Sequence, residues 1–582
     1  MFKLFRYLKP YWRQVLILLV ATGLQVFATL QLPALMADII NSGIANQDIG
    51  RIWQDGGLML ALAALSAVAS FVSSYYSAKV GAYFAMDLRA EIFTKILNFS
   101  LIDSKNFSTA SLITRSTNDV SQVQMALTMM LSMLLRAPLF CIIGITMAIR
   151  TAPEMSWIIV VGVTAVAISV AIIMSIIAPR FKVMQRLIDK VTLITRENLT
   201  GLKVIRAFNN DELEQKKFKK TNNDLTKLLI VVDRILELQN PLINIIFNGT
   251  TLLCSWVGLM LFKENYNYLG NMTAFAEYVT YVMMSFLMLS LFFILIPRAN
   301  VSAGRINEVL KTKEKIHWPK KTVGVPEKTP KVEFRKVCFA YPEAAEKVLY
   351  NISFVAEAGK TTAFIGSTGS GKSTLINLVP RFYEATAGEI LIDGLPIKNY
   401  TRDDLRSRIG LVPQKGLLFS GTVASNIKFG APNATTEQIK KAAEIAQADK
   451  FIMKLPGEYS AHISQGGTNV SGGQRQRLAI ARAICKRPDI YVFDDAFSAL
   501  DMKTDAKLRE ALRPITSEAV VLIVAQRVST IKDADQIVVL DKGRMVGKGT
   551  HRELLKSCAV YQSIVKSQLS DAEWRKEING TK

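Results

Sequence analysis

The chain contains 582 residues, of which 50% are hydrophobic and 20% are charged, and its formal net charge is +23. This length allows several domains, the apolar content excludes a disordered chain, and the low share of charge points to a part embedded in a membrane. Five scattered cysteines without a CxxC pair and three dispersed histidines argue against a disulfide scaffold, a zinc cluster or a histidine-rich metal site.

The chain starts with a basic segment, MFKLFRYLKPYWRQ, which leads directly into an apolar run. The run is too long for a signal peptide and no convincing cleavage site follows it. We therefore expect the segment to remain as a cytoplasmic elbow before a retained membrane span. Since no organelle-targeting pattern is seen, we expect the protein in the plasma membrane, which is the inner membrane if the cell is Gram-negative.

Six long apolar stretches fill the first half of the chain. Each has about 20 residues or more, which is enough to cross a bilayer core as a helix. Buried soluble helices are a poor alternative for six such stretches in one half of a chain, so we expect six membrane-spanning helices in contact with lipid. The stretches lie at roughly 15–40, 57–77, 127–149, 156–179, 242–262 and 273–297.

The connections between these stretches indicate their orientation. Residues 41–56, 150–155 and 263–272 form short connections, whereas 78–126 and 180–241 are long and polar, and the last is rich in lysine and arginine. Because positively charged loops stay in the cytoplasm, we expect both termini and both long connections there. The long connections are helix-forming, so the spans are expected to continue as helices below the membrane. This topology accounts for the net charge, and no nucleic-acid partner is expected.

A linker and a second domain follow the last span. The segment PKKTVGVPEKTPK is rich in proline, lysine and glycine and lacks periodicity, which is typical of a linker. We therefore expect a transmembrane domain over residues 1–325 and a second domain over 326–582. From residue 332 onward, β-rich runs such as TTAFIG, IYVFDD and QIVVL alternate with helical stretches, which indicates an α/β domain with a largely parallel sheet.

The motif GSTGSGKS, from Gly366 to Ser373, carries the strongest functional signal. It follows the apolar strand TTAFI and opens a helix predicted over residues 374–382, which is the context of a P-loop. Glycines let several backbone N–H groups point at one anion, and the helix N-terminus adds its dipole. Lys372 would bridge the β- and γ-phosphates of ATP, and Ser373 would hold Mg²⁺. The expected fold is an all-α six-helix transmembrane domain followed by an α/β P-loop ATPase domain.

Two further motifs extend the phosphate chemistry. The strand IYVFD ends in Asp494, which is expected to emerge beside the P-loop and to hold the Mg²⁺ shell. In VSGGQRQRLAIARA, a small-residue turn precedes a basic helix and forms a second anion site. Since one domain has one P-loop, two domains facing head to tail would explain both turns. Each ATP would then lie between the P-loop of one domain and the SGGQ turn of the other.

Five motifs in this order, GSTGSGKST, VPQ, VSGGQ, IYVFDD and SALD, resemble those of an ABC transporter nucleotide-binding domain. With the six spans, and with DVSQVQ and ENLTGLKVIRAF in the long connections, nearly the whole chain resembles an ABC half-exporter of the multidrug-resistance type. The resemblance implies that Gln414 contacts Mg²⁺ or water and that Asp501 faces a partner domain. It also implies that Tyr341 stacks on adenine, with a simple strand-end tyrosine as the alternative. The implied P-loop and signature residues are Gly366, Ser367, Thr368, Gly369, Ser370, Gly371, Lys372, Ser373, Thr374, Ser471, Gly472, Gly473 and Gln474.

Two positions depart from the family pattern. Asp495 stands where the family usually has a glutamate that acts as general base, and Gln526 stands where it has a switch histidine. A displacement near 1 Å of a catalytic group costs about a hundredfold in rate, and aspartate is one methylene shorter. Gln526 can donate a hydrogen bond but stays neutral. We therefore predict that the chain binds ATP and hydrolyses it slowly, as in the degenerate-site subunit of a heterodimeric bacterial exporter. A homodimer with two slow sites is the alternative.

The expected function is ATP-driven export of amphipathic or hydrophobic small molecules, such as drug-like compounds or lipids. An ATP-gated regulatory or channel-like membrane protein is the alternative function. Arg136 lies within a span, where a charged residue is a functional candidate, but a packing role is favoured over a substrate contact. The motifs leave the transported substrate open.

Overall fold

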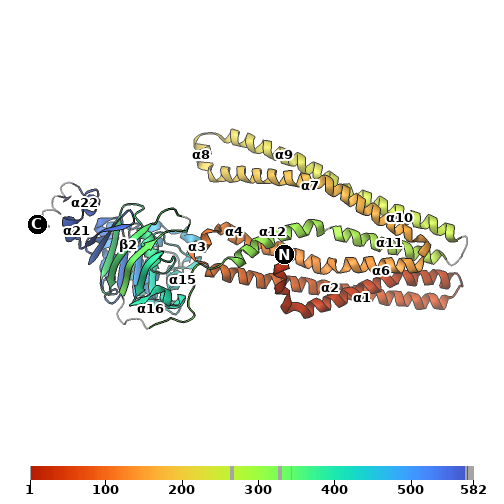
Figure 1. Ribbon diagram of the computed structural model, residues 1–582, viewed down its shortest axis with the longest axis horizontal. Coiled ribbons are helices and arrows are strands. Elements are labelled where there is room, and N and C mark those ends of the chain that lie inside the picture. The colour runs from red at the N-terminus through yellow and green to blue at the C-terminus, as the bar shows by residue number, and fades with distance from the viewer. Residues whose placement is uncertain are drawn as a thin grey trace. The chain divides into compact units, whose positions relative to one another are not determined.

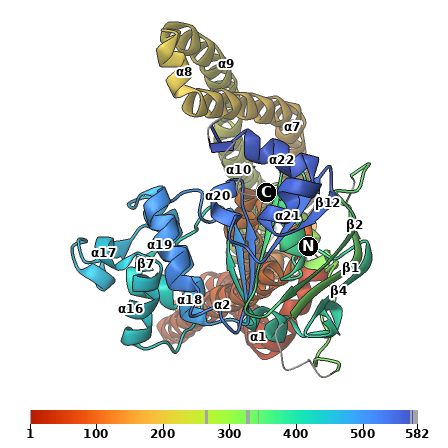
Figure 2. The ribbon, with the colours of Figure 1, turned by 90° about the vertical axis from the view of Figure 1, so that its left-hand side faces the viewer.

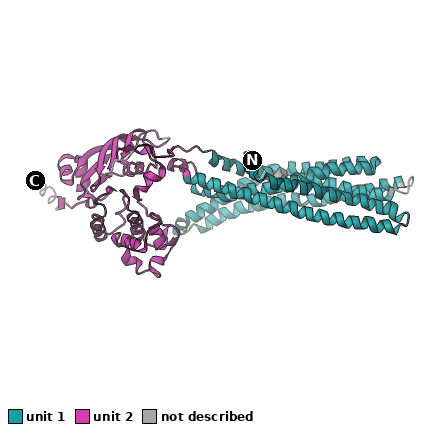
Figure 3. Ribbon diagram, turned by 90° about the horizontal axis from the view of Figure 1, so that it is seen from below, with its two compact units in different colours: residues 1–97, 108–312 teal, residues 98–107, 313–582 magenta. Residues whose placement is uncertain are grey.

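The computed structural model describes residues 2–262, 268–290, 292–324, 331–342, 344–570 and 573–574. The described chain divides into two compact units, which Figure 3 colours separately. Unit 1 contains residues 1–97 and 108–312, and unit 2 contains residues 98–107 and 313–582. The domain boundary predicted between residues 325 and 326 lies outside the described residues.

Unit 1 is built from helices. They are η1 (Phe2–Tyr11), α1 (Trp12–Asp38), η2 (Ile39–Ile44), α2 (Ile49–Asn98), α4 (Thr109–Thr114), η3 (Arg115–Asp119), α5 (Val120–Met129), η4 (Met130–Leu134), α6 (Arg136–Thr151), η5 (Pro153–Met155), α7 (Ser156–Thr200), α8 (Leu202–Ala207), α9 (Asp211–Glu237), α10 (Gln239–Phe262), α11 (Tyr268–Ser290) and α12 (Phe292–Lys311). Among the described residues, six helical segments are long and apolar enough to cross a membrane. The six expected membrane-spanning helices are thereby confirmed in length and composition.

Two of these helices are longer than a bilayer requires. Helix α2 has 50 residues and α7 has 45. At 1.5 Å per residue, each runs on the order of 70 Å, about twice the thickness of the hydrocarbon core. The expectation that the spans continue as helices beyond the membrane agrees with these lengths. Figure 1 shows α7 and α9 side by side, with the short α8 joining them at one end.

The core of unit 1 lies around α11, which packs against α1, α6, α7 and α10. Tyr278 and Val282 are buried on its inner face, and Gly144 of α6 lets the helices approach closely, because a Cβ there would lie 3.0 Å from Val282 Cγ2. In contrast, Leu60 and Phe71 on α2 are 75% and 72% exposed. An apolar face of this kind is stable against lipid or against another apolar surface.

The described part of unit 2 contains a six-stranded sheet with the order β12-β11-β3-β10-β9-β6. Its strands are β3 (Thr361–Gly366), β6 (Ile409–Val412), β9 (Ile490–Asp494), β10 (Val520–Val524), β11 (Gln536–Asp541) and β12 (Arg544–Gly549). All neighbours pair in parallel except β12, which runs antiparallel to β11. The expected α/β domain with a largely parallel sheet is confirmed. Parallel strands end at the same edge, so the loops after β3, β6, β9 and β10 lie near one another.

A second, antiparallel sheet goes beyond the sequence expectation. In the described residues its order is β2-β1-β4-β5, from β1 (Lys331–Phe339), β2 (Leu349–Glu357), β4 (Ala387–Ile392) and β5 (Leu395–Pro396). Figure 2 shows β1, β2 and β4 together on one side of the unit. Val332 and Phe334 face the core, but the register shifts between Phe334 and Val337. This bulge interrupts the alternation of apolar and polar residues by which a half-buried strand is recognised.

The remaining elements of unit 2 connect and cover these sheets. They are α3 (Leu101–Lys105), α13 (Lys372–Leu378), η6 (Ile397–Asn399), α14 (Arg402–Ser407), β7 (Gly421–Thr422), α15 (Val423–Lys428), α16 (Thr436–Ile445), α17 (Asp449–Ile452), η7 (Glu458–Ser460), β8 (His462–Ile463), η8 (Gln465–Gly467), α18 (Gly472–Lys486), α19 (Met502–Leu512), α20 (Val528–Ile531), α21 (His551–Ser557) and α22 (Ala559–Lys566). The helix predicted over residues 374–382 is wrong at its end. It stops at Leu378 because Pro380 disfavours a helical conformation in the residue before it.

Candidate nucleotide site

Two glycines shape the loop between β3 and α13. A Cβ on Gly366 would lie 2.0 Å from the carbonyl oxygen of Leu540 in the neighbouring strand. Gly371 has a φ of +94°, a backbone conformation that side chains with a Cβ rarely adopt. The chain can therefore turn directly from the strand into the N-terminus of α13, whose N-cap is Gly371 and where no side chain of the described residues makes a capping hydrogen bond.

Lys372 folds back into this loop. Its side chain is buried, and its Nζ donates to the carbonyl oxygens of Gly366 and Ser367, at 2.8 Å each, and to Ser370 Oγ at 3.4 Å. Burial lowers the pKa of Lys372, and the charges of Asp495 and Asp494 act in the opposite direction. The loop thus holds a cation against two of its own carbonyl oxygens and a serine hydroxyl, and a cation in this place suits a phosphate anion.

Ser373 and Asp494 lie together at the carboxyl edge of the parallel sheet. Ser373 Oγ donates to Asp494 Oδ1 at 2.9 Å. The contact follows from the strand order, because β10 alone separates β3 from β9. Burial raises the pKa of Asp494, and the hydrogen bond from Ser373 counteracts this effect. A hydroxyl and a carboxylate are the hard oxygen donors that Mg²⁺ prefers, so these residues fit that ion.

Asp495 and Gln414 meet in the same region. The Asp495 N–H donates to the Val524 carbonyl at 3.0 Å, and its φ of +49° turns the chain sharply after β9. Asp495 is 7% exposed, and its carboxylate accepts a hydrogen bond from Gln414 Nε2 at 3.3 Å. The two residues expected to handle water and Mg²⁺ therefore contact each other directly.

Gln476 holds the loop that carries Gln414, and sequence reasoning missed it. This glutamine of α18 is 2% exposed. Its Nε2 donates to the Pro413 carbonyl at 3.1 Å, and its Oε1 accepts from the Gly416 N–H at 3.0 Å. The carboxamide therefore forms hydrogen bonds with the backbone on both sides of Gln414. Its position two residues after Gln474, on the inner face of the signature helix, is the signal that could have identified it.

The SGGQ turn forms the exposed N-terminus of α18. The Ser471 N–H donates to Gln474 Oε1 at 2.9 Å, and the Gln474 N–H donates to Ser471 Oγ at 3.3 Å, a reciprocal capping box. Gly473 passes close to the chain after β9, since a Cβ there would lie 3.2 Å from the Ala499 carbonyl oxygen. The side chain that caps the helix is thus presented at the surface together with two small residues.

Asp501, Tyr341 and Gln526 occupy three other turns. Asp501 is exposed and caps α19 by accepting from the Thr504 N–H at 2.9 Å, and hydrogen bonds from the Thr504 side chain and N–H lower the pKa of Asp501. The Tyr341 hydroxyl and Thr374 Oγ1 are 2.9 Å apart, which ties the tyrosine to α13. Gln526 follows β10 at the carboxyl edge and is exposed.

Comparison with known proteins identifies the family. The family model described as ABC transporter transmembrane region matches residues 15–286, and the model described as ABC transporter matches residues 349–498. An ABC transporter ATP-binding protein of Mycobacterium tuberculosis is 39% identical, with 97% of each chain covered. The chain belongs to the ABC transporter family. Its combination of membrane and nucleotide-binding parts is that of an ABC half-transporter of the exporter type.

Other relatives of this ABC half-transporter are similar over their whole length. An ATP-dependent lipid A-core flippase of Hahella chejuensis is 31% identical, with 98% of this chain and 97% of that protein covered. The solved structure of a bacterial Atm1-family ABC exporter with ATP bound matches with a TM-score of 0.80 at 23% identity, covering 96% of this chain and 99% of the other. The chain is accordingly a multi-pass membrane protein and an ATPase-coupled transporter, and ABC exporters work as dimers.

In this ABC half-transporter, residues 98–107 belong to unit 2 although they lie between two helices of unit 1 in the sequence. Ser100 and Asp103 form a capping box at the start of α3, and Ile102 packs against the core below the antiparallel sheet. Arg402 Nη1 donates to Asn98 Oδ1 at 2.8 Å. A short piece of the membrane half is thereby built into the nucleotide-binding half.

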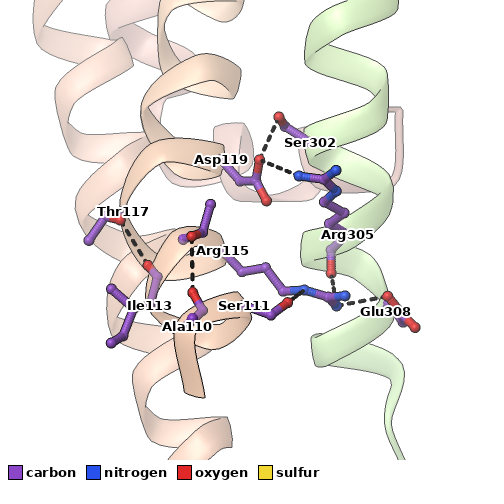
Figure 4. A network of polar contacts seen from close by, with 10 residues as sticks. Ala110, Ser111, Ile113, Arg115, Thr117, Asp119, Ser302, Arg305 and Glu308 are labelled. Carbon is purple, nitrogen blue, oxygen red and sulfur yellow. Dashed lines mark hydrogen bonds and ion pairs between the residues drawn. The ribbon is translucent and has the colours of Figure 1, made fainter. Parts of the chain in front are cut away.

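A polar network in unit 1 joins η3, which lies shortly after residues 98–107 in the sequence, to α12, the helix that leads to the linker (Figure 4). Asp119 Oδ1 accepts from Ser302 Oγ at 2.8 Å and lies 3.8 Å from Arg305 Nη1. Arg115 Nη1 lies 2.7 Å from Glu308 Oε2 and donates to the Arg305 carbonyl at 2.9 Å. These contacts connect η3 with α12 inside unit 1. Each of the two lies close in sequence to a point where the chain passes from one unit to the other.

Proposed function

We propose that this chain is one half of a heterodimeric ABC exporter that moves amphipathic or hydrophobic small molecules, drug-like compounds or lipids, across the plasma membrane. Its own P-loop site binds ATP and hydrolyses it slowly. Its SGGQ turn completes the faster site, whose general base and switch residue come from the partner subunit. The observation that carries the proposal is the contact between Asp495 and Gln414 beside an otherwise complete P-loop.

The assembled residues support ATP binding by this site. In the proposal, Lys372 pairs with the β- and γ-phosphates, the N–H groups of residues 366–374 surround them, and Tyr341 stacks on adenine. Ser373, Asp494 and Gln414 would hold Mg²⁺, which when bound neutralises charge that develops on the phosphates.

The weak step lies with Asp495 and Gln526. Asp495 is held by its backbone bond to Val524 and its carboxylate is engaged with Gln414 at 3.3 Å. A shorter acid held in this way is poorly placed to take a proton from an attacking water, and catalytic rates fall about a hundredfold per 1 Å of misplacement. Gln526 adds a hydrogen-bond donor without a positive charge. Both residues act on the ATP of this chain, so the slow step is local to one site of the dimer.

The opposite site depends on residues that follow the family pattern. Ser471, Gly472, Gly473 and Gln474 form a helix N-terminus whose first two residues are exposed. Asp501 caps an exposed turn two residues after Ala499, whose carbonyl oxygen lies close to Gly473. Such an N-terminus favours negative charge, as on the phosphates of an ATP held by a second subunit. A partner with a glutamate and a histidine would then give the dimer one fast and one slow site.

Substrate class and orientation complete the proposal. Related proteins named as lipid A-core flippases act on an amphipathic lipid, and the six apolar segments of this chain suit a cargo of similar character. Both termini and the two long connections lie in the cytoplasm, since the connection between α7 and α10 is rich in lysine and arginine. Export would run from the cytoplasmic side outward.

The test compares two substitutions in the purified dimer with its partner. Ser471→Ala should reduce overall ATP hydrolysis strongly, because it acts on the fast site, whereas Asp495→Asn should reduce it little. Thr435→Ala is a matched control, since Thr435 caps α16 in a capping box with Gln438. Its loss lowers the stability of the fold by about 1 kcal/mol, as the loss of the Ser471 cap does. The reverse ranking of Ser471→Ala and Asp495→Asn would contradict the assignment, and fast hydrolysis by this chain alone would favour a homodimer.

A further inference from the structure

Gln568 reaches the loop that carries Gln526 from a distant part of the chain. It follows α22, and its Nε2 donates to the Gln526 carbonyl at 2.8 Å. Its Oε1 accepts from the Val528 N–H, also at 2.8 Å. Both polar groups of one carboxamide are thus used on the two peptide groups that flank Arg527.

The backbone of the loop explains this fit. Arg527 is extended, with φ −97° and ψ 127°. In an extended residue, the preceding carbonyl and the following N–H point to the same side, where a neighbouring strand would bind them. The carboxamide of Gln568 takes the place of such a strand. On the other side of Gln526, the Ala525 N–H donates to the Phe364 carbonyl at 3.1 Å, so the loop is held before and after Gln526.

The segment that carries Gln568 is itself anchored. Ile564, Leu569 and Trp574 pack against the hydrophobic core of unit 2 on either side of Gln568. The Ser570 N–H donates to Glu573 Oε2 at 2.9 Å. Because the neighbouring residues are already ordered by packing, holding the glutamine in place costs little additional conformational entropy.

We propose that Gln568 is a positioning residue for ATP hydrolysis, which fixes the loop backbone and so aims the Gln526 side chain at the γ-phosphate. The inference rests on the role proposed for Gln526, a hydrogen-bond donor to the ATP of this chain at the position of the family's switch histidine, which is called its switch role. The same device holds the Gln414 loop, where Gln476 also bonds to a carbonyl and an N–H on either side of a functional glutamine. Gln568 differs in being exposed, so its removal leaves no buried cavity.

The experiment uses the full-length chain in lipid nanodiscs, assembled with its partner, and two readouts. The first is single-turnover hydrolysis of γ-labelled ATP bound by this chain, at several ATP concentrations. The second is hydrogen exchange of the Val528 amide. The variants are Gln568→Ala, Gln568→Glu, Gln526→Ala and the double variant that combines Gln568→Ala with Gln526→Ala. Gln562→Ala is the matched control, because Gln562 lies in α22 and its Nε2 donates to the Leu555 carbonyl, away from the loop.

We expect Gln568→Ala to lower the hydrolysis rate about tenfold at saturating ATP, with the half-saturating ATP concentration unchanged. The Val528 amide should exchange roughly tenfold faster. In the Gln568→Glu chain, the Val528 amide should exchange at an intermediate rate, since glutamate keeps the acceptor for the Val528 N–H and loses the donor to the Gln526 carbonyl. Gln562→Ala should behave as the unaltered chain, and in the Gln526→Ala background the loss of Gln568 should have no further effect.

Two results would overturn the inference while leaving the switch role of Gln526 intact. One is a Gln568→Ala chain with unchanged hydrolysis, and the other is a further tenfold loss when Gln568→Ala is added to Gln526→Ala. If Gln526→Ala alone leaves hydrolysis unchanged, the switch role itself is refuted, and the positioning role of Gln568 is refuted with it.

Discussion

Replacing Asp495 by glutamate tests whether one methylene limits hydrolysis at this site. The backbone of Asp495 is fixed by its N–H bond to Val524 at 3.0 Å and by a left-handed φ of +49°. The backbone therefore cannot move the carboxylate forward, whereas an added methylene extends its reach by about 1.5 Å. Since 1 Å of misplacement costs about a hundredfold, we expect Asp495→Glu to raise the single-turnover rate by roughly 10- to 100-fold.

The assay measures phosphate release and ATP affinity on the same preparations. Asp495→Asn is the control of equal size without a base, and it should slow the residual hydrolysis while ATP affinity stays unchanged. An extra methylene at a buried position can cost about 1–3 kcal/mol, so thermal unfolding is measured in parallel. A folded Asp495→Glu chain that binds ATP normally and hydrolyses it no faster than the unaltered chain would refute the reasoning.

Substitutions at Gln476, Arg402 and Asp119 test three further contacts described above. Gln476→Met should lower the free energy of unfolding of unit 2 by about 1–3 kcal/mol, because it removes both hydrogen bonds from the buried Gln476 to the backbone of Pro413 and Gly416. Gln476→Glu should restore part of this free energy in thermal unfolding, since it keeps an acceptor for the Gly416 N–H. Arg402→Ala removes the hydrogen bond to Asn98 at the end of α2, so it should reduce the number of substrate molecules moved per ATP in vesicles while basal hydrolysis is retained. Asp119→Ala should destabilise unit 1 more than Glu308→Ala does, since Asp119 is buried and Glu308 is exposed, and equal shifts in unfolding temperature would contradict this.

The candidate site could be predicted where its residues follow a strand. Lys372 and Ser373 follow the short loop after β3, Asp494 is the last residue of β9, and Asp495 comes directly after it. Parallel strands bring their carboxyl ends to one edge of the sheet. Spacing in the sequence therefore indicated their proximity, and the hydrogen bond from Ser373 to Asp494 agrees with it. The roles of these residues stay predictions.

The parts that escaped prediction depend on contacts between distant residues. Gln476 and Gln568 bind backbone groups of loops that lie about 60 and 40 residues away, and a lone glutamine carries no periodic pattern. The antiparallel sheet was hidden by the bulge in β1. Residues 98–107 follow a long helix without a change in composition, so their inclusion in unit 2 was visible only in the structure.

In the proposed heterodimer, ATP bound at the P-loop of this chain stays bound and unhydrolysed for much longer than one turnover of the dimer takes. The measurement follows labelled nucleotide at the Lys372 site of the assembled transporter during steady-state hydrolysis. A chemical quench determines whether this nucleotide is ATP or ADP. We predict that it remains ATP through many turnovers of the dimer. Conversion to ADP at the rate of overall turnover would contradict the account.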